Sequence, residues 1–269
     1  MKRNRAKLAL FDMDGTLTPA RQKITKRMVE SILNLLSVTR VGIVSGSGID
    51  YIEQQCGDLI DEILARDELV SRFVIMPCNG TKLYSLDKKH RKKKLHDVSM
   101  SEKMGTANYN ALVRKMMQLT LDVHEEHDIP CTGTFISYRG SMLNWAIPGR
   151  DCTLAQREDY HKIDSKLKIR ESLVSEIKSY IDKNMSCGIE TAIGGEISID
   201  IFPAGWDKTY ALTHHPDAMY SFVGDKCFPG GNDYSIYKLL KSTGHISFSS
   251  CNPDETCGII SNELIPYFS

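Results

Sequence analysis

The sequence lacks an apolar stretch long enough to cross a bilayer, and it has no excess of charge of either sign. A transmembrane helix needs about 20 consecutive apolar residues, whereas the apolar run at residues 8–11 (LALF) ends at Asp12. That run is also too short for the hydrophobic region of a secretory signal. The 34 basic and 34 acidic side chains give a formal net charge of +0, so any anion site must be local. We therefore predict a cytoplasmic protein that binds neither nucleic acid nor a membrane.

Closely spaced cysteine pairs are also absent. The eight cysteines are scattered without a C-x-x-C motif, at Cys56, Cys78, Cys131, Cys152, Cys187, Cys227, Cys251 and Cys257. This pattern is typical of reduced thiols and argues against a disulfide framework or a zinc site. The chain has 269 residues, of which 41% are hydrophobic and 25% charged, as in an ordinary globular protein of one large domain or two modest ones.

The amino-terminal third alternates strand and helix patterns. Short apolar runs at residues 8–11, 41–44 and 73–76 are each typical of a buried strand in a parallel sheet. Between the first two runs, Met28 and Ile32 recur at the spacing of an amphipathic helix. Strands joined by helices of this length imply right-handed crossovers, so we predict a parallel sheet.

The middle of the chain has a different pattern. A basic run at residues 87–94 (DKKHRKKK) predicts a solvated loop. It is followed by two helical stretches, a hairpin-like pair of strands and one further strand, at residues 107–121, 165–181, 134–138, 143–147 and 196–202. Strands joined by a tight turn indicate an antiparallel sheet with helices on one face.

A strand-like run returns at residues 221–225, so the two ends of the chain share one pattern. We predict an α/β fold with a Rossmann-like parallel-sheet core and an inserted α+β cap domain of antiparallel sheet plus helices. The core would comprise residues 1–85 and 202–269, and the cap residues 86–201.

Two aspartates directly follow the first apolar strand, in the segment Asp12-Met13-Asp14-Gly15-Thr16. In an open parallel sheet, ligands bind at the carboxyl ends of the strands, so Asp12 and Asp14 would project into one site. Gly15 would let the backbone turn away at once. One carboxylate could attack phosphorus while the other manages a proton.

A second acidic cluster follows the run at residues 221–224, with Asp225 and, after a glycine pair, Asp233. A hard cation such as Mg²⁺ binds a few carboxylates together with waters and substrate phosphate. We predict a magnesium site formed by Asp12, Asp225 and the main-chain carbonyl of Asp14. The cation would offset the repulsion between an anionic nucleophile and an anionic phosphate.

Two more residues complete this set. Ser45, at the end of the second strand, offers a hydroxyl and neighbouring N–H groups to phosphate oxygens. Lys208 could hold the nucleophile ionised and screen charge, and we place both residues among the substrate-binding residues. A lone D-x-D-G-T segment is a common turn, but the ordered set of D-x-D-G-T, strand-end serine, lysine and G-D-x(6)-N-D indicates a functional site.

This set resembles the haloacid dehalogenase superfamily, and further segments resemble the eukaryotic-type phosphomannomutases within it. The segments are residues 11–24 (FDMDGTLTPARQKI), 134–139 (TFISYR), 142–144 (MLN), 148–150 (PGR), 194–200 (GGEISID), 202–208 (FPAGWDK) and 229–233 (PGGND). The resemblance extends from about residue 7 to residue 240, and the cap segments make it specific to this family.

The resemblance implies roles for the matching positions. Asp12 would be phosphorylated, and Asp14 would be the general acid and base. The hexose phosphate would be bound by Arg21, Arg139, Arg150, Arg157, Ser198 and Asp200. A mutase must hold a sugar that carries two phosphates, and guanidinium groups from the cap suit the second one. Members of the family commonly pair through their caps, which implies a homodimer.

The implied activity is that of a phosphomannomutase, which interconverts mannose 6-phosphate and mannose 1-phosphate through a phosphoaspartyl enzyme and hexose 1,6-bisphosphate. A sugar-phosphate phosphatase of the same superfamily and a non-catalytic sugar-phosphate-binding module stay open as alternatives. So does the preference between mannose and glucose phosphates. Leu239 stands where the family has an aspartate that helps a second, structural cation, which leaves that second site open as well.

Overall fold

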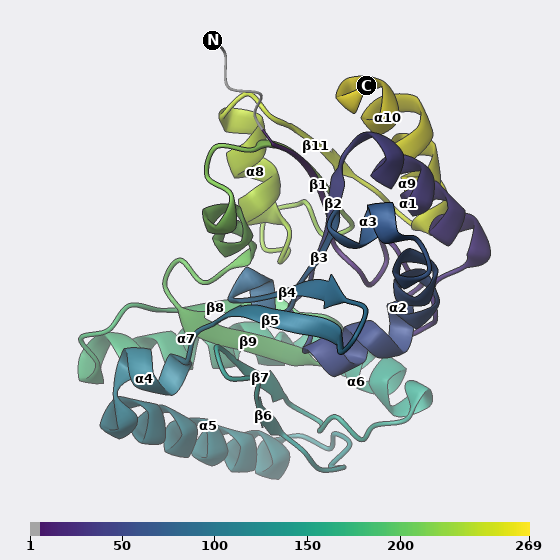
Figure 1. Cartoon of the computed structure of the whole chain (residues 1–269). Helices are drawn as coiled ribbons and strands as arrows, with labels where there is room; N and C mark the ends of the chain where they lie inside the picture. The colour runs from purple at the N-terminus through teal and green to yellow at the C-terminus, as the bar shows by residue number, and fades with distance from the viewer. Residues whose placement is uncertain (1–5) are drawn as a thin grey trace. The chain divides into compact units, whose positions relative to one another are not determined.

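The chain forms two compact units in the computed structural model, which describes residues 6–269 (Figure 1). Unit 1 is built from both ends of the chain, up to Asp97 and from Trp206 to Ser269, and unit 2 is the segment Val98–Gly205. The predicted cap boundaries at residues 86 and 201 therefore differ from those of unit 2. Among the described residues, no helix is both long and apolar enough to cross a membrane.

Unit 1 contains a seven-stranded sheet in the order β11-β10-β1-β2-β3-β4-β5. Its parallel strands are β1 (Lys7–Phe11), β2 (Arg40–Val44), β3 (Phe73–Met76), β10 (Met219–Gly224) and β11 (Ile246–Ser249). The central strand β1 pairs with β10 on one side and β2 on the other, and Leu8 lies opposite both Tyr220 and Arg40. Four consecutive buried residues in β1 explain its continuous apolar sequence, because helices cover both faces of such a sheet.

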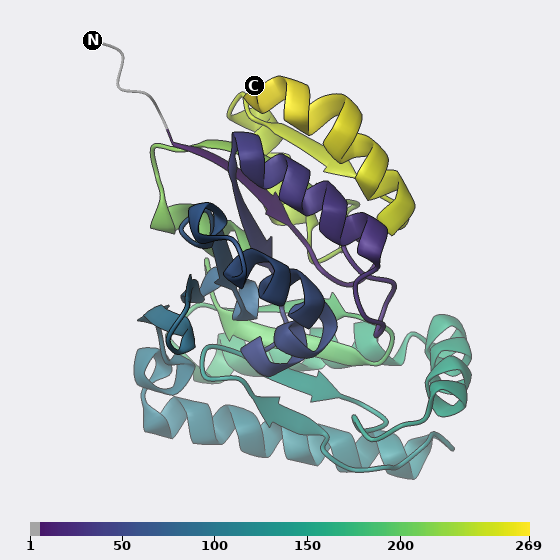
Figure 2. The same cartoon turned by 45° about the vertical axis from the view of Figure 1, so that its right-hand side comes forward.

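Helices cover the two faces of this sheet. They are α1 (Lys26–Val38), α2 (Ile49–Leu64), α3 (Asp67–Val70), α8 (Tyr234–Ser242), α9 (Pro253–Ile259) and α10 (Ile265–Phe268), with short helical turns η1 (Cys78–Gly80), η2 (Lys208–His214) and η3 (Ile260–Leu264). Met28 and Ile32 of α1 are buried in the same cluster as Phe268 of α10. Figure 2 shows α1 beside the carboxy-terminal helices. On the other face, α8 packs over β10 and β11.

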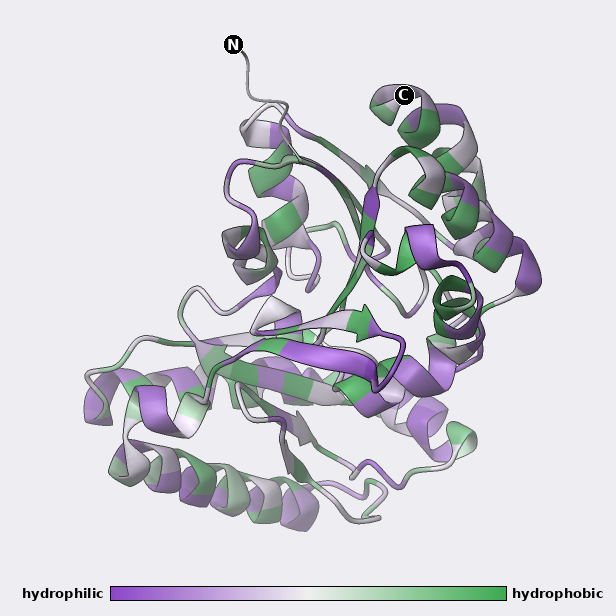
Figure 3. Cartoon of the chain, in the orientation of Figure 1, coloured by the Kyte–Doolittle hydropathy of each residue, from purple (hydrophilic) through white to green (hydrophobic). Residues whose placement is uncertain are grey.

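The basic run is a loop only in part: residues 88–90 form the turn of a hairpin at the edge of the sheet, and residues 91–94 lie in the second strand of that hairpin. Strands β4 (Lys82–Asp87) and β5 (Arg91–Asp97) pair antiparallel, which explains why unit 2 begins after residue 97. The hydrophilic colouring of β5 stands out in Figure 3. Lys92 meets Glu53 at 2.5 Å, and lysines on an edge strand discourage pairing with other chains.

Unit 2 contains an antiparallel sheet in the order β6-β7-β9-β8. Its strands are β6 (Ile136–Tyr138), β7 (Leu143–Ala146), β8 (Ile189–Gly194) and β9 (Ser198–Pro203), and its helices are α4 (Met100–Met104), α5 (Thr106–Glu126), α6 (Leu154–Leu167) and α7 (Ile169–Asn184). Trp145 of β7 is fully buried, and its indole N–H donates to Thr120 of α5 at 2.9 Å. That face of the sheet is therefore the one on which the helices pack.

The predicted helix at residues 165–181 is wrong in its extent. The chain forms two helices here, α6 and α7, which meet at Lys168 in a left-handed conformation with φ +59°. The fold class itself is confirmed, since a mostly parallel sheet and a separate antiparallel sheet with helices are both present.

Candidate active site

The topology of unit 1 brings the ends of three neighbouring strands to one edge of the sheet. Asp12 follows β1, Ser45 follows β2 and Asp225 follows β10, and all three strands run parallel. The backbone N–H of Asp12 donates to Val223 of β10 at 2.9 Å, which continues the ladder into the site. The strand-end residues thus converge because of strand order and direction alone.

Three carboxylates form a compact acidic cluster at this edge. One oxygen each from Asp12, Asp225 and Asp233 lies within 4.8 Å of the other two. Asp12 and Asp233 are buried, whereas Asp225 is partly exposed. Fully buried Lys208, the first residue of η2, donates hydrogen bonds to both Asp12 and Asp233. Four charged groups from four segments of the chain therefore share one small volume.

Two glycines make room for this cluster. Gly15 has φ +85°, and a Cβ atom there would lie 2.6 Å from the Oδ2 atom of Asp225. A Cβ atom on Gly224 would lie 2.7 Å from the Oδ2 atom of Asp233. Side chains at either position would displace a carboxylate, so the close approach of these loops requires glycine.

The electrostatics of the cluster disfavour three ionised carboxylates. Burial, and after it the nearby Asp233 carboxylate, raise the pKa of Asp12 to about 8 against the opposing effect of Lys208. Burial also raises the pKa of Asp225 to about 6. At Lys208, burial lowers the pKa, but the Asp12 and Asp233 carboxylates outweigh that effect and raise it overall. The lysine stays charged, yet it does not offset the excess of negative charge, so the cluster can accept a cation.

Asp14 points its carboxylate elsewhere. Its Oδ1 atom accepts two hydrogen bonds, from the backbone N–H of Arg21 and from the hydroxyl of Tyr51, each at 3.1 Å. Its side chain is not part of the acidic cluster, and the metal contact through its main-chain carbonyl stays a prediction. The Arg21 side chain is exposed, and its backbone has φ +62°.

Ser45 lies in a braced loop that leads into α2. Its Oγ atom accepts from the backbone N–H of Ser47 at 3.1 Å. The neighbouring turn η1 supports this loop, because Asn79 donates its N–H to the Ser45 carbonyl at 2.8 Å and Cys78 donates its N–H to the Ser47 carbonyl at 3.0 Å. Gly48 precedes α2 and makes no side-chain cap hydrogen bond.

Unit 2 gathers most of its predicted binding residues into one chain of contacts. Ser198 and Asp200 lie on one face of β9, and Asn144 of β7 donates to Asp200 at 2.6 Å. Arg150 donates to the side-chain oxygen of Asn144. Buried Arg157 of α6 donates to the backbone carbonyl of Arg150 at 3.3 Å. The side chains of Asn144, Ser198 and Asp200 lie on the sheet face opposite the one that holds Trp145.

Arg139 lies directly after β6. Its backbone N–H donates to the Met142 carbonyl at 2.9 Å, which closes the turn between β6 and β7. The binding roles of all five predicted residues of unit 2 stay predictions.

Sequence reasoning did not assign three residues that contact the predicted ones within their own units. Asp233 was visible in the G-G-N-D segment, but only the fold shows that its carboxylate returns to Asp12. Asn144 belongs to a segment that carries the family resemblance, without a role of its own. Tyr51 belongs to no motif, so the sequence offers no signal for its contact with Asp14.

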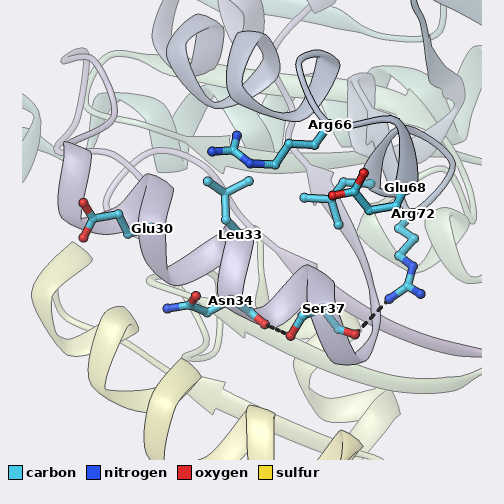
Figure 4. Close-up of a pocket in the computed structure, with 8 residues that line it drawn as sticks. Glu30, Leu33, Asn34, Ser37, Arg66, Glu68 and Arg72 are labelled. Atoms are coloured by element: carbon cyan, nitrogen blue, oxygen red, sulfur yellow. Dashed lines mark hydrogen bonds between the residues drawn. The ribbon is translucent and has the colours of Figure 1, made fainter.

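Unit 1 also contains a hollow of about 490 Å³ that is separate from the acidic cluster. It is lined by Glu30, Leu33, Asn34, Ser37, Arg66, Glu68, Leu69 and Arg72 from α1 to α3 (Figure 4). Its arginines have structural partners, since Arg72 donates to the carbonyls of Leu36 and Ser37 at the end of α1 and Arg66 pairs with Glu62. It shares no residue with the acidic cluster.

Comparison with known proteins agrees with this geometry. The family model for eukaryotic phosphomannomutase matches residues 28–265. Phosphomannomutase 1 of Dictyostelium discoideum is 36% identical over 262 residues, which cover 94% of this chain and 95% of that protein. The phosphomannomutase of Schizosaccharomyces pombe is 35% identical, with 93% and 91% covered.

Solved structures show the same fold at greater distance. An N-terminally truncated Plasmodium falciparum IMP-nucleotidase superposes with a TM-score of 0.66 at 14% identity, covering 98% of this chain and 71% of that one. That likeness concerns the fold alone. The family match and the near-complete coverage of both curated relatives decide the classification: this chain belongs to the eukaryotic phosphomannomutase family.

Proposed function

We propose that this chain interconverts mannose 6-phosphate and mannose 1-phosphate, through a phosphorylated Asp12 and a hexose 1,6-bisphosphate. The observation that carries the proposal is the buried Asp12 carboxylate at the sheet edge beside Asp225, Asp233 and Lys208. Support also comes from relatives named phosphomannomutase that align along nearly the whole chain. Neither the phosphatase nor the binding module has comparable support.

The site fits a divalent metal ion, and we propose Mg²⁺. The raised pKa values of Asp12 and Asp225 reflect repulsion and burial that a bound cation would relieve. Beside Asp233, the buried side-chain oxygen of Asn232 has no hydrogen-bond partner among the described residues. Asp12, Asp225 and Asp233, with the main-chain carbonyl of Asp14, would hold the ion. When bound, Mg²⁺ neutralises charge on the nucleophile and on the transferring phosphoryl group.

The reaction needs two transfers that share these residues. In the first, an oxygen of Asp12 forms a bond to phosphorus while the bond from phosphorus to the sugar oxygen breaks, and Asp14 gives that oxygen a proton. In the second, Asp14 takes a proton from the other sugar hydroxyl, which attacks phospho-Asp12 and frees its carboxylate. Lys208 favours the ionised form of Asp12 before attack.

The second phosphate of the bisphosphate needs an anion site of its own. We propose that Arg139, Arg150 and Arg157 of unit 2 provide it, since guanidinium groups bind phosphate with two parallel hydrogen bonds. Ser198 and Asp200 would hold sugar hydroxyls, because residues two apart on a strand point to the same side. The contact between Asn144 and Asp200 supports a fixed orientation for that carboxylate.

We also propose that the chain forms a homodimer through unit 2. Met117 and Leu121 of α5 are 56% and 60% exposed, and they lie one turn apart on the outer surface of the helix. Sedimentation of the purified protein would give the mass of a dimer, and charged substitutions at both positions would give a monomer.

A single assay tests the proposed activity. Purified protein, Mg²⁺ and mannose 1-phosphate are mixed with a trace of glucose 1,6-bisphosphate, and phosphorus NMR follows the products. We expect mannose 6-phosphate to accumulate and the rate to rise with the bisphosphate. Steady release of inorganic phosphate without isomerised product would instead identify a phosphatase. A parallel reaction with glucose 1-phosphate measures the sugar preference.

Asp12→Asn is the matched variant for this assay. The amide is close in size to the carboxylate but is a poor nucleophile, so we expect turnover to be abolished while the circular dichroism spectrum stays unchanged. Residual turnover above a few per cent of wild type would mean that another group receives the phosphoryl group.

A further inference from the structure

Tyr51 lies beside the second aspartate of the site. It is in the first turn of α2, three residues after Gly48, and its hydroxyl donates to the Oδ1 atom of Asp14 at 3.1 Å. The backbone N–H of Arg21 donates to the same oxygen at 3.1 Å. Within residues 6–269, the Oδ2 atom of Asp14 accepts no hydrogen bond from the protein.

We propose that Tyr51 is a positioning residue that orients the Asp14 carboxylate for proton transfer. The inference rests on the proposed function, in which Asp14 protonates the leaving sugar oxygen and deprotonates the attacking one. Two donors on Oδ1 fix the plane of the carboxylate and leave Oδ2 to carry the proton. Without them, the terminal torsion of an aspartate is broad, and the carboxylate samples many orientations.

The surroundings of Tyr51 are suited to this task. The tyrosine is half-buried, and its ring packs against the core cluster that contains Ile52 and Cys56 of the same helix. Both of those residues are fully buried, so they hold the helix, and with it the tyrosine ring, against the core. A small misplacement of a catalytic group lowers the reaction rate strongly. A rigid hydrogen-bond donor such as the Tyr51 hydroxyl, which holds the Asp14 carboxylate in place, therefore supports a high rate.

The chemistry predicts where Tyr51 matters. A sugar oxygen leaves as a strongly basic alkoxide unless it receives a proton, so transfer from a hexose phosphate depends on Asp14. An activated aryl phosphate such as p-nitrophenyl phosphate has a leaving group that needs no proton. Its transfer to Asp12 therefore depends little on Asp14, and by extension little on Tyr51.

Tyr51→Phe tests the proposal, because it removes the hydroxyl and keeps the ring. We expect kcat for mannose 1-phosphate to fall by about tenfold, the usual worth of a hydrogen bond to a charged group, with little change in KM. With p-nitrophenyl phosphate, we expect the first-turnover release of p-nitrophenolate, which reports the transfer to Asp12 alone, to stay within about twofold of wild type. In the Asp14→Asn background, Tyr51→Phe should cause no further loss.

Tyr84→Phe is the control, since Tyr84 of β4 packs against the same core cluster and is remote from any assigned role. It should leave both reactions unchanged. Equal losses on both substrates, no loss on either, or additive losses in the double variant would each overturn the proposal. If the wild-type protein releases only phosphate from mannose 1-phosphate, the proposed function fails, and the same comparison of substrates still decides the role of Tyr51.

Discussion

At the scale of single residues, the site is governed by the cost of holding carboxylates together away from water. Asp12 and Asp233 are buried beside partly exposed Asp225, and Lys208 bridges the two buried ones. The pKa of Asp12 is raised to about 8 and that of Asp225 to about 6. A protein that keeps such a cluster gives up stability near neutral pH unless a cation binds there.

The stability of the metal-free protein should therefore fall as pH rises from about 4 to about 8, from the ordinary aspartate pKa of 3.8 through the folded-state pKa values of Asp225 and then Asp12. Both values lie above the ordinary 3.8, so the folded state holds protons that the unfolded chain has released. Raising the pH then favours unfolding. Thermal denaturation in EDTA across this interval measures the slope.

Mg²⁺ should reverse part of this trend, since it binds the ionised carboxylates and its stabilising effect grows with pH. In Asp12→Asn the slope in EDTA should become smaller, because one of the titrating groups is gone. A melting temperature in EDTA that does not change between these pH values would contradict the assignment.

At the scale of elements, the site depends on the close approach of the loop after β1 to the loop after β10, which Gly15 permits. Gly15→Ala should both destabilise the fold and weaken Mg²⁺ binding. The positive φ costs roughly 1–3 kcal/mol in a residue with a Cβ atom, and that atom would displace the Asp225 carboxylate. Chemical denaturation and a Mg²⁺ titration measure the two effects separately.

Gly244→Ala is the matched control for that substitution. Gly244 has a similar φ of +80°, but a Cβ atom there would meet nothing within 4 Å. It should lose a comparable amount of stability and bind Mg²⁺ as wild type does. Equal Mg²⁺ affinities for the two variants would show that the contact with Asp225 is unimportant.

The sequence predicted the elements that carry continuous apolar patterns. Strands β1, β2, β3 and β10 were located because a buried parallel strand is apolar on both faces. β5 was missed because its lysines are depleted in strands, and only pairing with β4 and acidic partners on α2 explains it. The break at Lys168 was missed because no glycine or proline marks it.

The site residues divide in the same way, into those that a local sequence pattern locates and those that depend on tertiary packing. The convergence of Asp12, Ser45 and Asp225 was predictable, since neighbouring parallel strands end at the same edge. The inclusion of Asp233 and the contact from Tyr51 were not, because both depend on how a loop or a helix returns in three dimensions. Local patterns specify which edge binds, whereas the orientation of each side chain comes from tertiary packing.

At the scale of the whole molecule, each unit contains one of the two tryptophans, Trp145 in unit 2 and Trp206 in unit 1. The variants Trp206→Phe and Trp145→Phe therefore give fluorescence signals from one unit each. We expect Mg²⁺ to raise the unfolding midpoint that Trp206 reports by several degrees and to change the Trp145 midpoint less, since the acidic cluster lies in unit 1. A larger shift at Trp145 would place the bound ion in unit 2.

The division of unit 1 between two distant stretches of sequence also sets an order of events at the ribosome. Unit 2 is one continuous segment, and its synthesis is complete before that of β10 begins. Asp12 is among the first residues made, but its acidic partners Asp225 and Asp233 are made more than two hundred residues later. A nascent chain thus carries Asp12 through most of translation without its acidic neighbours, and the cluster that could hold a metal ion is complete only when synthesis has passed Asp233.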